Sequence, residues 1–200
     1  FYAASSHIFG RPDVVPQDES TPINPVTVYG ITKASGLFLC REYRKTHKVF
    51  ASVGILYNHE SLLRGEQFVS RKIVEGAVRC RRDSSCRLTL GNLASIADWG
   101  YAPDYVDAMH RILSFKEPDD FVVATGEKHT VADFARIAFE ACGLDWHHFV
   151  EERREIITRP ANPFIGNPKK LVQRTGWKPS VDFPGMIKNL VRQAEEEHGN

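Results

Sequence analysis

The sequence predicts an α/β protein organised around a parallel β-sheet, and three observations support that prediction. Short apolar segments at 1–4, 50–56 and 121–125 resemble strands that are covered on both faces. Segments with a helical spacing of apolar residues alternate with them, which is the order of strand–helix–strand units. The 200 residues include 26 basic and 25 acidic ones, a composition typical of a globular core with balanced charge.

Local signals support the other predicted elements. We expect Asp104 to cap a helix, and Thr130 with Asp133 to form a capping box that opens a helix to Cys142, with Gly143 as its C-cap. Residues 91–103 read as a loop. In chain order, the predicted helices are 26–48, 67–79, 104–114, 130–142, 169–175 and 182–196, and a further short strand is predicted at 87–90.

Tyr29 and Lys33 are four residues apart in the predicted helix 26–48, so their side chains lie on one face, one turn apart. A tyrosine phenol in water has a pKa of about 10, and a neighbouring ammonium group favours the phenolate. A phenol activated in this way can take a proton from a sugar or alcohol hydroxyl near neutral pH. The alternative is that Tyr29 packs and Lys33 is solvated, because this spacing occurs by chance in many helices.

Polar side chains follow the first two predicted strands where each strand ends. Ser5 and Ser6 follow the first strand, and Asn-His-Glu at 58–60 follows the second. The carboxyl ends of parallel strands meet at one edge of a sheet, where α/β proteins place functional groups. We therefore expect both groups to line the same edge, with a serine hydroxyl holding the substrate oxygen that Tyr29 deprotonates.

Charge distribution, apolar run length and the spacing of cysteines and histidines argue against several classes of function. No basic run indicates a nucleic-acid partner, and no apolar run approaches the ~20 residues that span a membrane. The arginines between 79 and 87 lie among acidic residues, so we expect them on a solvated face. The cysteines at 40, 80, 86 and 142 lack metal-ligand spacing and fit a reduced, cytoplasmic protein. His147 and His148 are expected on a surface loop.

The sequence lacks the glycine-rich pattern that binds the phosphates of a dinucleotide. It contains neither Gly-x-Gly-x-x-Gly nor Gly-x-x-Gly-x-x-Gly, and it begins at Phe1, without Met, inside a predicted strand. If the protein uses a nucleotide cofactor, we expect the half that carries this loop to lie upstream of Phe1.

A series of motifs gives the sequence a family resemblance from Ala3 to about Pro179. In chain order they are Ser-Ser-x-x-Phe-Gly at 5–10, Tyr-x-x-x-Lys at 29–33, Asn-His-Glu-Ser at 58–61, Phe-Val-Ser-Arg-Lys-Ile at 68–73, Leu-Gly-Asn-Leu at 90–93, Asp-Trp-Gly-Tyr-Ala-x-Asp-Tyr-Val at 98–106, Ala-Thr-Gly-Glu at 124–127 and Gly-Trp-Lys-Pro at 176–179. Together they resemble the extended short-chain dehydrogenase/reductase superfamily and, within it, the GDP-mannose 4,6-dehydratase family.

The resemblance implies a fold and a set of ligands. Residues 1–57 would form the C-terminal half of a Rossmann-type doubly wound parallel sheet. Residues 58–200 would form mainly a smaller mixed α/β substrate-binding lobe, with segments that return to the Rossmann domain. The cofactor would be NADP, or else NAD, and the substrate a nucleotide sugar. Relatives commonly pair through the helix that carries Tyr29 and Lys33, which implies a homodimer or homotetramer.

The resemblance also implies residue roles. Tyr29 would take the proton of the sugar 4-hydroxyl, Lys33 would bind the nicotinamide ribose, and Ser5 would hydrogen-bond the C4 oxygen. The reaction would oxidise C4, eliminate water across C5–C6 and return hydride to C6. His59 and Arg64 match residues that contact the cofactor in the family. The residues that match family contacts with the diphosphate or the sugar are Asn58, Lys72 and Arg159.

Departures from the family pattern leave other functions open. His7 stands where the dehydratase has the Glu that removes the C5 proton; an imidazole, with a pKa of about 6.5, can act as that base or merely hydrogen-bond in the pocket. Ala97 replaces the Arg before Asp-Trp-Gly, Asn-Pro at 162–163 displaces a Glu, and Leu-Leu at 62–63 replaces Pro-Arg. The alternatives are a 4-epimerase or 4-keto reductase, which needs no C5 base, and a binding module without turnover.

Overall fold

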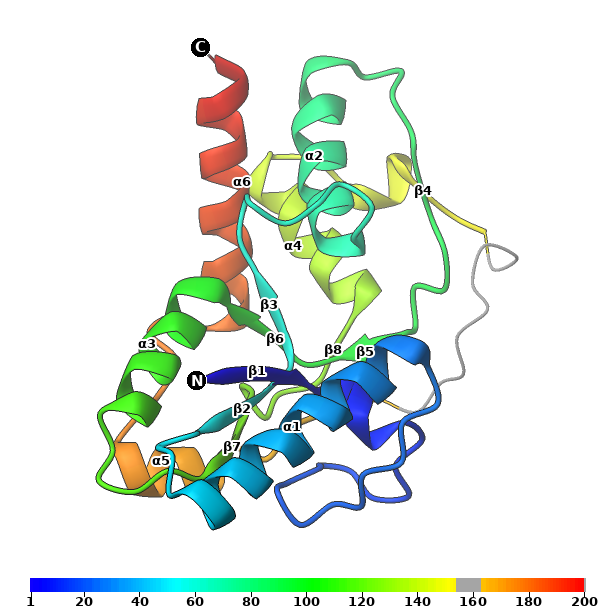
Figure 1. The fold of residues 1–200 in the computed structure, drawn as a ribbon. Helices are drawn as coiled ribbons and strands as arrows, with labels where there is room; N and C mark the ends of the chain where they lie inside the picture. Colours follow the sequence, from blue (N-terminus) through cyan, green and yellow to red (C-terminus); the bar gives the residue numbers. More distant parts are fainter. Residues whose placement is uncertain (154–162, 200) are drawn as a thin grey trace. The chain divides into compact units, whose positions relative to one another are not determined.

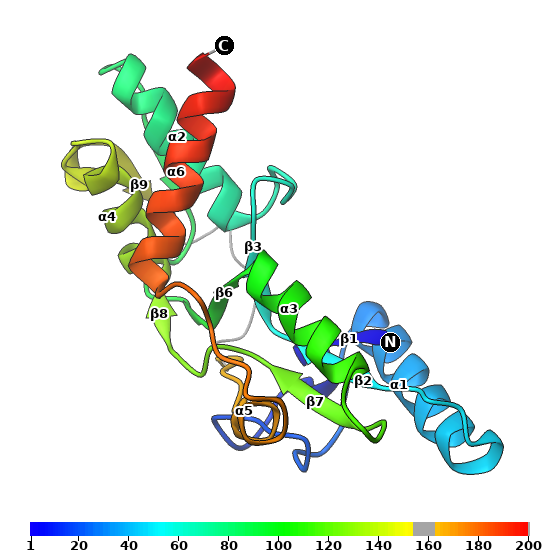
Figure 2. The same ribbon diagram turned by 90° about the vertical axis from the view of Figure 1, so that its left-hand side faces the viewer.

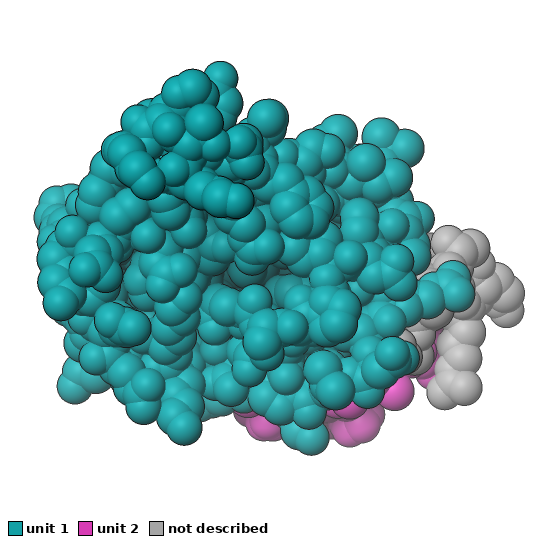
Figure 3. Space-filling view, turned by 60° about the horizontal axis from the view of Figure 1, so that its bottom comes forward, with its two compact units in different colours: residues 1–59, 98–128, 162–180 teal, residues 60–97, 129–161, 181–200 magenta. Residues whose placement is uncertain are grey.

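The computed structural model describes residues 1–153 and 163–199, and the chain divides into two compact units (Figures 1 and 3). Unit 1 consists of residues 1–59, 98–128 and 162–180, and unit 2 consists of residues 60–97, 129–161 and 181–200. Each unit is therefore assembled from three separate stretches of the sequence. Among the described residues, no helix is both long enough and apolar enough to cross a membrane.

Unit 1 is built on a three-stranded parallel sheet. Its strands are, in spatial order, β1 (Tyr2–Ser5), β2 (Val53–Leu56) and β7 (Asp120–Val123). The register pairs Ser5 with Leu56, and Leu56 with Val123, so the three strands end level at one edge. The predicted α/β class with a parallel sheet is confirmed.

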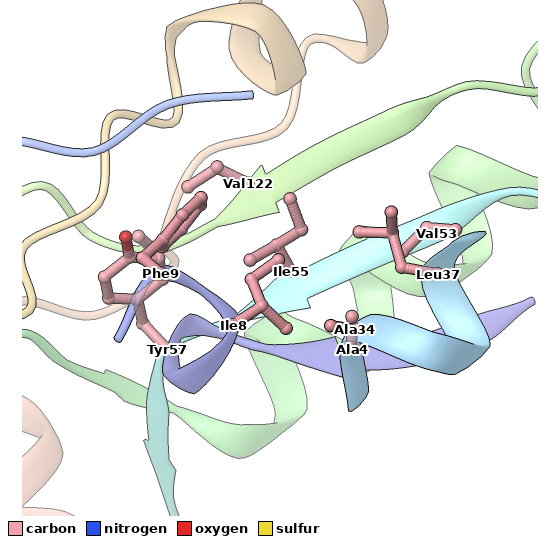
Figure 4. Close-up of a cluster of buried hydrophobic side chains, with 10 residues drawn as sticks. Ala4, Ile8, Phe9, Ala34, Leu37, Val53, Ile55, Tyr57 and Val122 are labelled. Carbon is pink, nitrogen blue, oxygen red and sulfur yellow. The ribbon is translucent and has the colours of Figure 1, made fainter. Parts of the chain in front are cut away.

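Helices cover both faces of this sheet. They are α1 (Val28–His47) on one face, and α3 (Ala102–Leu113) and α5 (Lys169–Thr175) on the other. Val53 and Ile55 of β2 pack with Leu37 of α1 in the cluster drawn in Figure 4. Leu56 instead packs with Trp177 in the cluster on the opposite face. Alternate side chains of β2 thus enter two cores, which explains why the strand is apolar throughout.

The described residues of unit 2 form three α-helices and two small sheets. The helices α2 (Val69–Arg82), α4 (Val131–Ala141) and α6 (Phe183–Gly199) pack side by side (Figure 2). The strand pairs are β4 (Leu88–Leu90) with β9 (Val150–Glu152), parallel, and β5 (Ile96–Ala97) with β8 (His129–Thr130), antiparallel. The strand β3 (Asn58–Glu60), at the boundary of the two units in the sequence, pairs with β6 (Trp99–Tyr101). Short 3-10 helices are η1 (Ser6–Phe9) and η2 (Trp146–His148).

The capping box of α4 is confirmed. The Thr130 hydroxyl accepts a hydrogen bond from the Asp133 amide at 3.0 Å, and the Asp133 carboxylate accepts one from the Thr130 amide at 2.9 Å. Two other local predictions are wrong. Asp104 does not cap α3, because the cap is Tyr101 and the Asp104 carboxylate instead accepts the Ser180 amide at 3.1 Å. Residues 91–103 are not one loop: they contain β5 and β6, strands too short to show an alternating pattern.

Candidate active site

The candidate site begins where β1 ends. Ser5, the last residue of β1, is the N-cap of η1, and its Oγ accepts a hydrogen bond from the His7 amide at 3.3 Å. Ser5 and Ser6 are buried, whereas His7 is half-buried. The turn therefore presents a hydroxyl and an imidazole, two residues apart, at the carboxyl edge of the sheet.

Helix α1 carries Tyr29 and Lys33 and begins close to this turn. The Thr27 hydroxyl caps the helix by accepting the Gly30 amide at 3.0 Å. A Cβ atom added at Gly30 would lie 2.6 Å from the His7 carbonyl oxygen, so only glycine lets α1 pack this tightly against η1. The sequence analysis did not identify Gly30, although the residue stands inside the Tyr-x-x-x-Lys motif.

The Lys33 ammonium is anchored to the sheet. Its Nζ donates a hydrogen bond to the Ala3 carbonyl oxygen of β1 at 2.9 Å. The same atom lies 5.7 Å from the centroid of the Tyr29 ring and 5.6 Å from that of the Tyr2 ring. An ammonium group has three N–H donors, so the bond to Ala3 leaves two that it does not use. The lysine is half-buried and the Tyr29 side chain is 53% exposed, so a ligand can reach the phenol.

The His7 ring contacts two aromatic rings. Its centroid lies 5.6 Å from that of Tyr29, with the ring planes at 81°, and 5.4 Å from that of Phe164. His7 thus links the serine turn to the helix that carries Tyr29. Phe164 carried no motif in the sequence, since it lies in an irregular segment far along the chain, and only the fold shows its contact with His7.

Asn58 and His59 follow the end of β2 and are held by backbone carbonyl groups. Asn58 Nδ2 donates to the Asp98 carbonyl oxygen at 3.0 Å, and His59 Nδ1 lies 2.8 Å from the Tyr57 carbonyl oxygen. The His59 ring stacks on Tyr105, with 4.9 Å between centroids and 27° between planes. Because β1 and β2 end level, these residues follow the same sheet edge as the serine turn.

Asp98 joins two loops of unit 1 through one buried carboxylate. Its Oδ1 accepts the amide and the hydroxyl of Thr125 at 2.9 and 2.6 Å, and its Oδ2 accepts the amides of Gly126 and Gly166 at 3.0 and 3.2 Å. Burial raises the pKa of the Asp98 carboxyl, and the hydrogen bonds oppose that rise. The carboxylate therefore fixes the loop after β7 to the segment that carries Phe164.

Arg64 belongs to unit 2. Its guanidinium carbon lies 3.8 Å from the centroid of the Phe68 ring, and its Nε lies 3.4 Å from Glu60 Oε2. Glu60 is buried and accepts the Ser70 hydroxyl at 2.5 Å, and burial raises the pKa of its carboxyl. These contacts hold the Arg64 guanidinium against Phe68 and Glu60, a cluster that the sequence did not indicate.

Lys72, also in unit 2, donates from Nζ to the Thr89 carbonyl oxygen at 2.7 Å and is exposed. Arg159 lies outside the described residues. The predicted site residues that belong to unit 1 are Ser5, His7, Tyr29, Lys33, Asn58 and His59.

Residues 1–190 match the protein family described as GDP-mannose 4,6 dehydratase. The chain belongs to this family. The GDP-mannose 4,6-dehydratase match spans every site residue that the sequence predicted. The chain is 40% identical over 192 residues to GDP-mannose 4,6 dehydratase 2 of Arabidopsis thaliana, which covers 96% of this chain and 51% of that protein. It is 34% identical over 210 residues to the Homo sapiens GDP-mannose 4,6 dehydratase, a match that covers 96% of this chain and 56% of that protein. The chain thus spans about half the length of these curated relatives.

Solved structures share the Rossmann-type fold of this GDP-mannose 4,6-dehydratase family member. RMD from Pseudomonas aeruginosa, complexed with NADPH, superposes with a TM-score of 0.90 at 19% identity and covers 98% of this chain and 66% of its own. The dTDP-glucose 4,6-dehydratase of Bacillus anthracis, in complex with NAD, superposes with a TM-score of 0.86 at 16% identity. The match covers 98% of this chain and 61% of that one. These likenesses support the predicted Rossmann-type fold, and the family match confirms the predicted resemblance to the GDP-mannose 4,6-dehydratase family.

Proposed function

We propose that the full-length protein containing this chain is a nucleotide-sugar 4,6-dehydratase that converts GDP-mannose or a close analogue into its 4-keto-6-deoxy derivative. The observation that carries the proposal is the placement of Tyr29 and Lys33 beside the Ser5–His7 turn, in a chain of the GDP-mannose 4,6-dehydratase family. Unit 2, which contains Lys72, is the proposed substrate-binding lobe.

The residues present fit a nicotinamide cofactor, NADP or else NAD. Lys33 has two N–H donors beyond its bond to Ala3, which suit the vicinal hydroxyls of a ribose, and Tyr29 is accessible beside them. His59 and Arg64 are the proposed further contacts. When bound, the cofactor supplies the acceptor and the later donor of a hydride.

Side chains of this chain would carry out the proton transfers of the reaction. Tyr29 takes the proton of the sugar 4-hydroxyl while Ser5 holds the same oxygen, and the Lys33 ammonium lies 5.7 Å from the centroid of the Tyr29 ring. Once C4 is a ketone, the proton on C5 becomes acidic. His7 removes it, the electron pair of the C5–H bond forms the C5=C6 double bond, and the 6-hydroxyl takes the proton from the His7 imidazolium and leaves as water. Asn58, Lys72 and Arg159 are the proposed contacts with the diphosphate or the sugar.

A second candidate is a nucleotide-sugar 4-epimerase or 4-keto reductase. The observation that favours it is His7, because a carboxylate is the family's base at that position, whereas epimerisation and reduction need Tyr29 and Lys33 but no C5 base. In that case His7 serves only to orient the bound sugar.

Product analysis separates the candidates. The full-length protein is incubated with GDP-mannose and NADP, and the products are followed by alkaline absorbance and by the NADPH signal. A dehydratase forms a 4-keto-6-deoxy product without net change of cofactor, whereas a reductase consumes NADPH stoichiometrically when supplied with the 4-keto substrate. No conversion of any nucleotide sugar would favour the binding module and contradict the proposal.

A variant tests the role of His7 in elimination. His7→Gln should abolish water loss while C4 oxidation remains visible as transient NADPH, with the exposed His147→Gln as the matched control. Unchanged dehydration in His7→Gln would remove His7 from the mechanism.

We further propose that two copies of the protein pair through α1. The helix exposes a series of large apolar side chains, namely Val28, Ile31, Phe38, Leu39 and Tyr43. Sedimentation should show Phe38→Asp shifted towards the monomer, while Val106→Asp, at a residue of α3 that is even more exposed, leaves the assembly unchanged. A monomeric wild-type protein would contradict this pairing.

A further inference from the structure

Two cysteine thiols face each other at the end of α2. The helix ends at Arg82, and the Asp83 carboxylate then accepts the amide and the hydroxyl of Ser85 at 2.9 and 2.6 Å. The Cys86 amide donates to the Asp83 carbonyl oxygen at 3.0 Å, which closes the turn. The chain is thereby reversed, and the Sγ atoms of Cys80 and Cys86, six residues apart in the sequence, lie 2.8 Å from each other.

The two thiols differ in their surroundings. Cys80 is 1% exposed, and burial together with its hydrogen bond to Cys86 raises the pKa of its thiol to about 12. Cys86 is half-buried at the surface turn and accepts a hydrogen bond from Arg79 Nε at 3.1 Å. Cys86 is therefore the accessible nucleophile, and Cys80 is the protonated partner behind it.

We propose that Cys80 and Cys86 form a reversible disulfide, so that the turn at 83–86 is a redox modification site of unit 2. The oxidant is a hydroperoxide. The Cys86 thiolate attacks a peroxide oxygen, the O–O bond breaks, and Cys86 becomes a sulfenic acid. The Cys80 sulfur then attacks the Cys86 sulfur, and the hydroxyl leaves with the Cys80 proton as water. In sum, two thiols and one hydrogen peroxide give one disulfide and two waters.

The geometry suits this step and its reversal. The sulfur atoms must approach by about 0.8 Å to reach the length of a disulfide, a shift that an exposed turn can absorb. Two equivalents of a small thiol return the pair to the reduced state through a mixed disulfide at Cys86, the more accessible sulfur. The bridge would tether the start of β4, whose Thr89 carbonyl oxygen holds Lys72.

Peptide mapping of the full-length protein tests the proposal. The reduced protein is treated with hydrogen peroxide, alkylated, and digested with trypsin without reductant. We expect the peptides 80–81 and 83–87 joined and two hydrogen atoms lighter than the separate peptides, and we expect dithiothreitol to release them. Alkylation of both cysteines after peroxide treatment, or stepwise oxidation of Cys86 to the sulfinic acid while Cys80 stays a thiol, would overturn the proposal.

A second probe does not depend on an oxidant. Phenylarsine oxide binds two thiols that lie within reach of one another, and it should bind this pair. Binding there should be lost in Cys80→Ser and in Cys86→Ser and kept in the control variants Cys40→Ser and Cys142→Ser. If the Cys86→Ser variant bound phenylarsine oxide at this turn as well as the wild-type protein does, the pairing of the two thiols would be refuted, whatever the enzymatic activity of the protein.

Discussion

Replacing Asp98 by asparagine tests how the candidate site is held together. The asparagine oxygen can keep the two bonds to Thr125, but its NH2 group then faces the amides of Gly126 and Gly166, which are donors themselves. The Gly166 amide is buried and loses its acceptor, a loss that costs about 1–3 kcal/mol, whereas Gly126 is exposed and its amide can bond to water instead. We therefore expect Asp98→Asn to lower the free energy of unfolding by about 1–3 kcal/mol, a substantial share of the roughly 5–15 kcal/mol of a typical domain.

Urea unfolding of the full-length protein measures this difference. The matched control is Asp107→Asn, an exposed carboxylate on α3 that pairs with Arg111, for which we expect a loss below about 1 kcal/mol. Hydrogen exchange adds a local readout, since the amides of Gly126 and Gly166 should exchange faster in Asp98→Asn only. An Asp98→Asn protein as stable as the control, with both amides still protected, would refute the reasoning.

Three further predictions concern stability. Thr130→Ala should lower the free energy of unfolding of the α4 region by about 1 kcal/mol while Thr130→Ser keeps it, and equal stability of all three proteins in urea would contradict the capping box. Gly166→Ala should lower the free energy of unfolding by about 1–3 kcal/mol in the same assay, because the new Cβ would lie 2.3 Å from that of Ala124. A urea midpoint equal to that of the wild-type protein would contradict this packing. Stability should fall as the pH rises from about 9 to 11, because burial raises the pKa of Cys142 to about 11 and the folded state keeps a proton that the unfolded state has lost. Cys142→Ser should flatten that slope by up to about 1.4 kcal/mol per pH unit, and an unchanged slope would exclude this cause.

The sheet could be predicted from the sequence because its signals are local. The strand at β2 is a short apolar run, and α1 and α4 begin at a threonine that caps them. The positions of Ser5 and Asn58 follow from the same reasoning, since parallel strands end at one edge. The strands β5 and β6 could not be predicted, because two or three residues are too few to show a period and only their distant partners stabilise them.

The contacts that hold the site together could not be predicted from the sequence, because they join residues that are far apart in the chain. Asp98 opens one of the family motifs, yet its hydrogen-bond partners are 27, 28 and 68 positions away, so no short stretch of sequence contains the pattern. Phe164 reaches His7 across most of the chain in the same way. Cys80 and Cys86 were read as separate thiols, because their meeting depends on the turn that Asp83 forms.

The turnover of GDP-mannose by Tyr29→Phe tests the central claim most directly. Tyr43 lies on the same helix and is as exposed as Tyr29, so Tyr43→Phe is the matched control. If Tyr29 is the group that deprotonates the sugar, the full-length Tyr29→Phe protein should form the 4-keto-6-deoxy product about 10²–10⁴-fold more slowly, with Tyr43→Phe unchanged. Equal rates in Tyr29→Phe, Tyr43→Phe and the wild-type protein would contradict it.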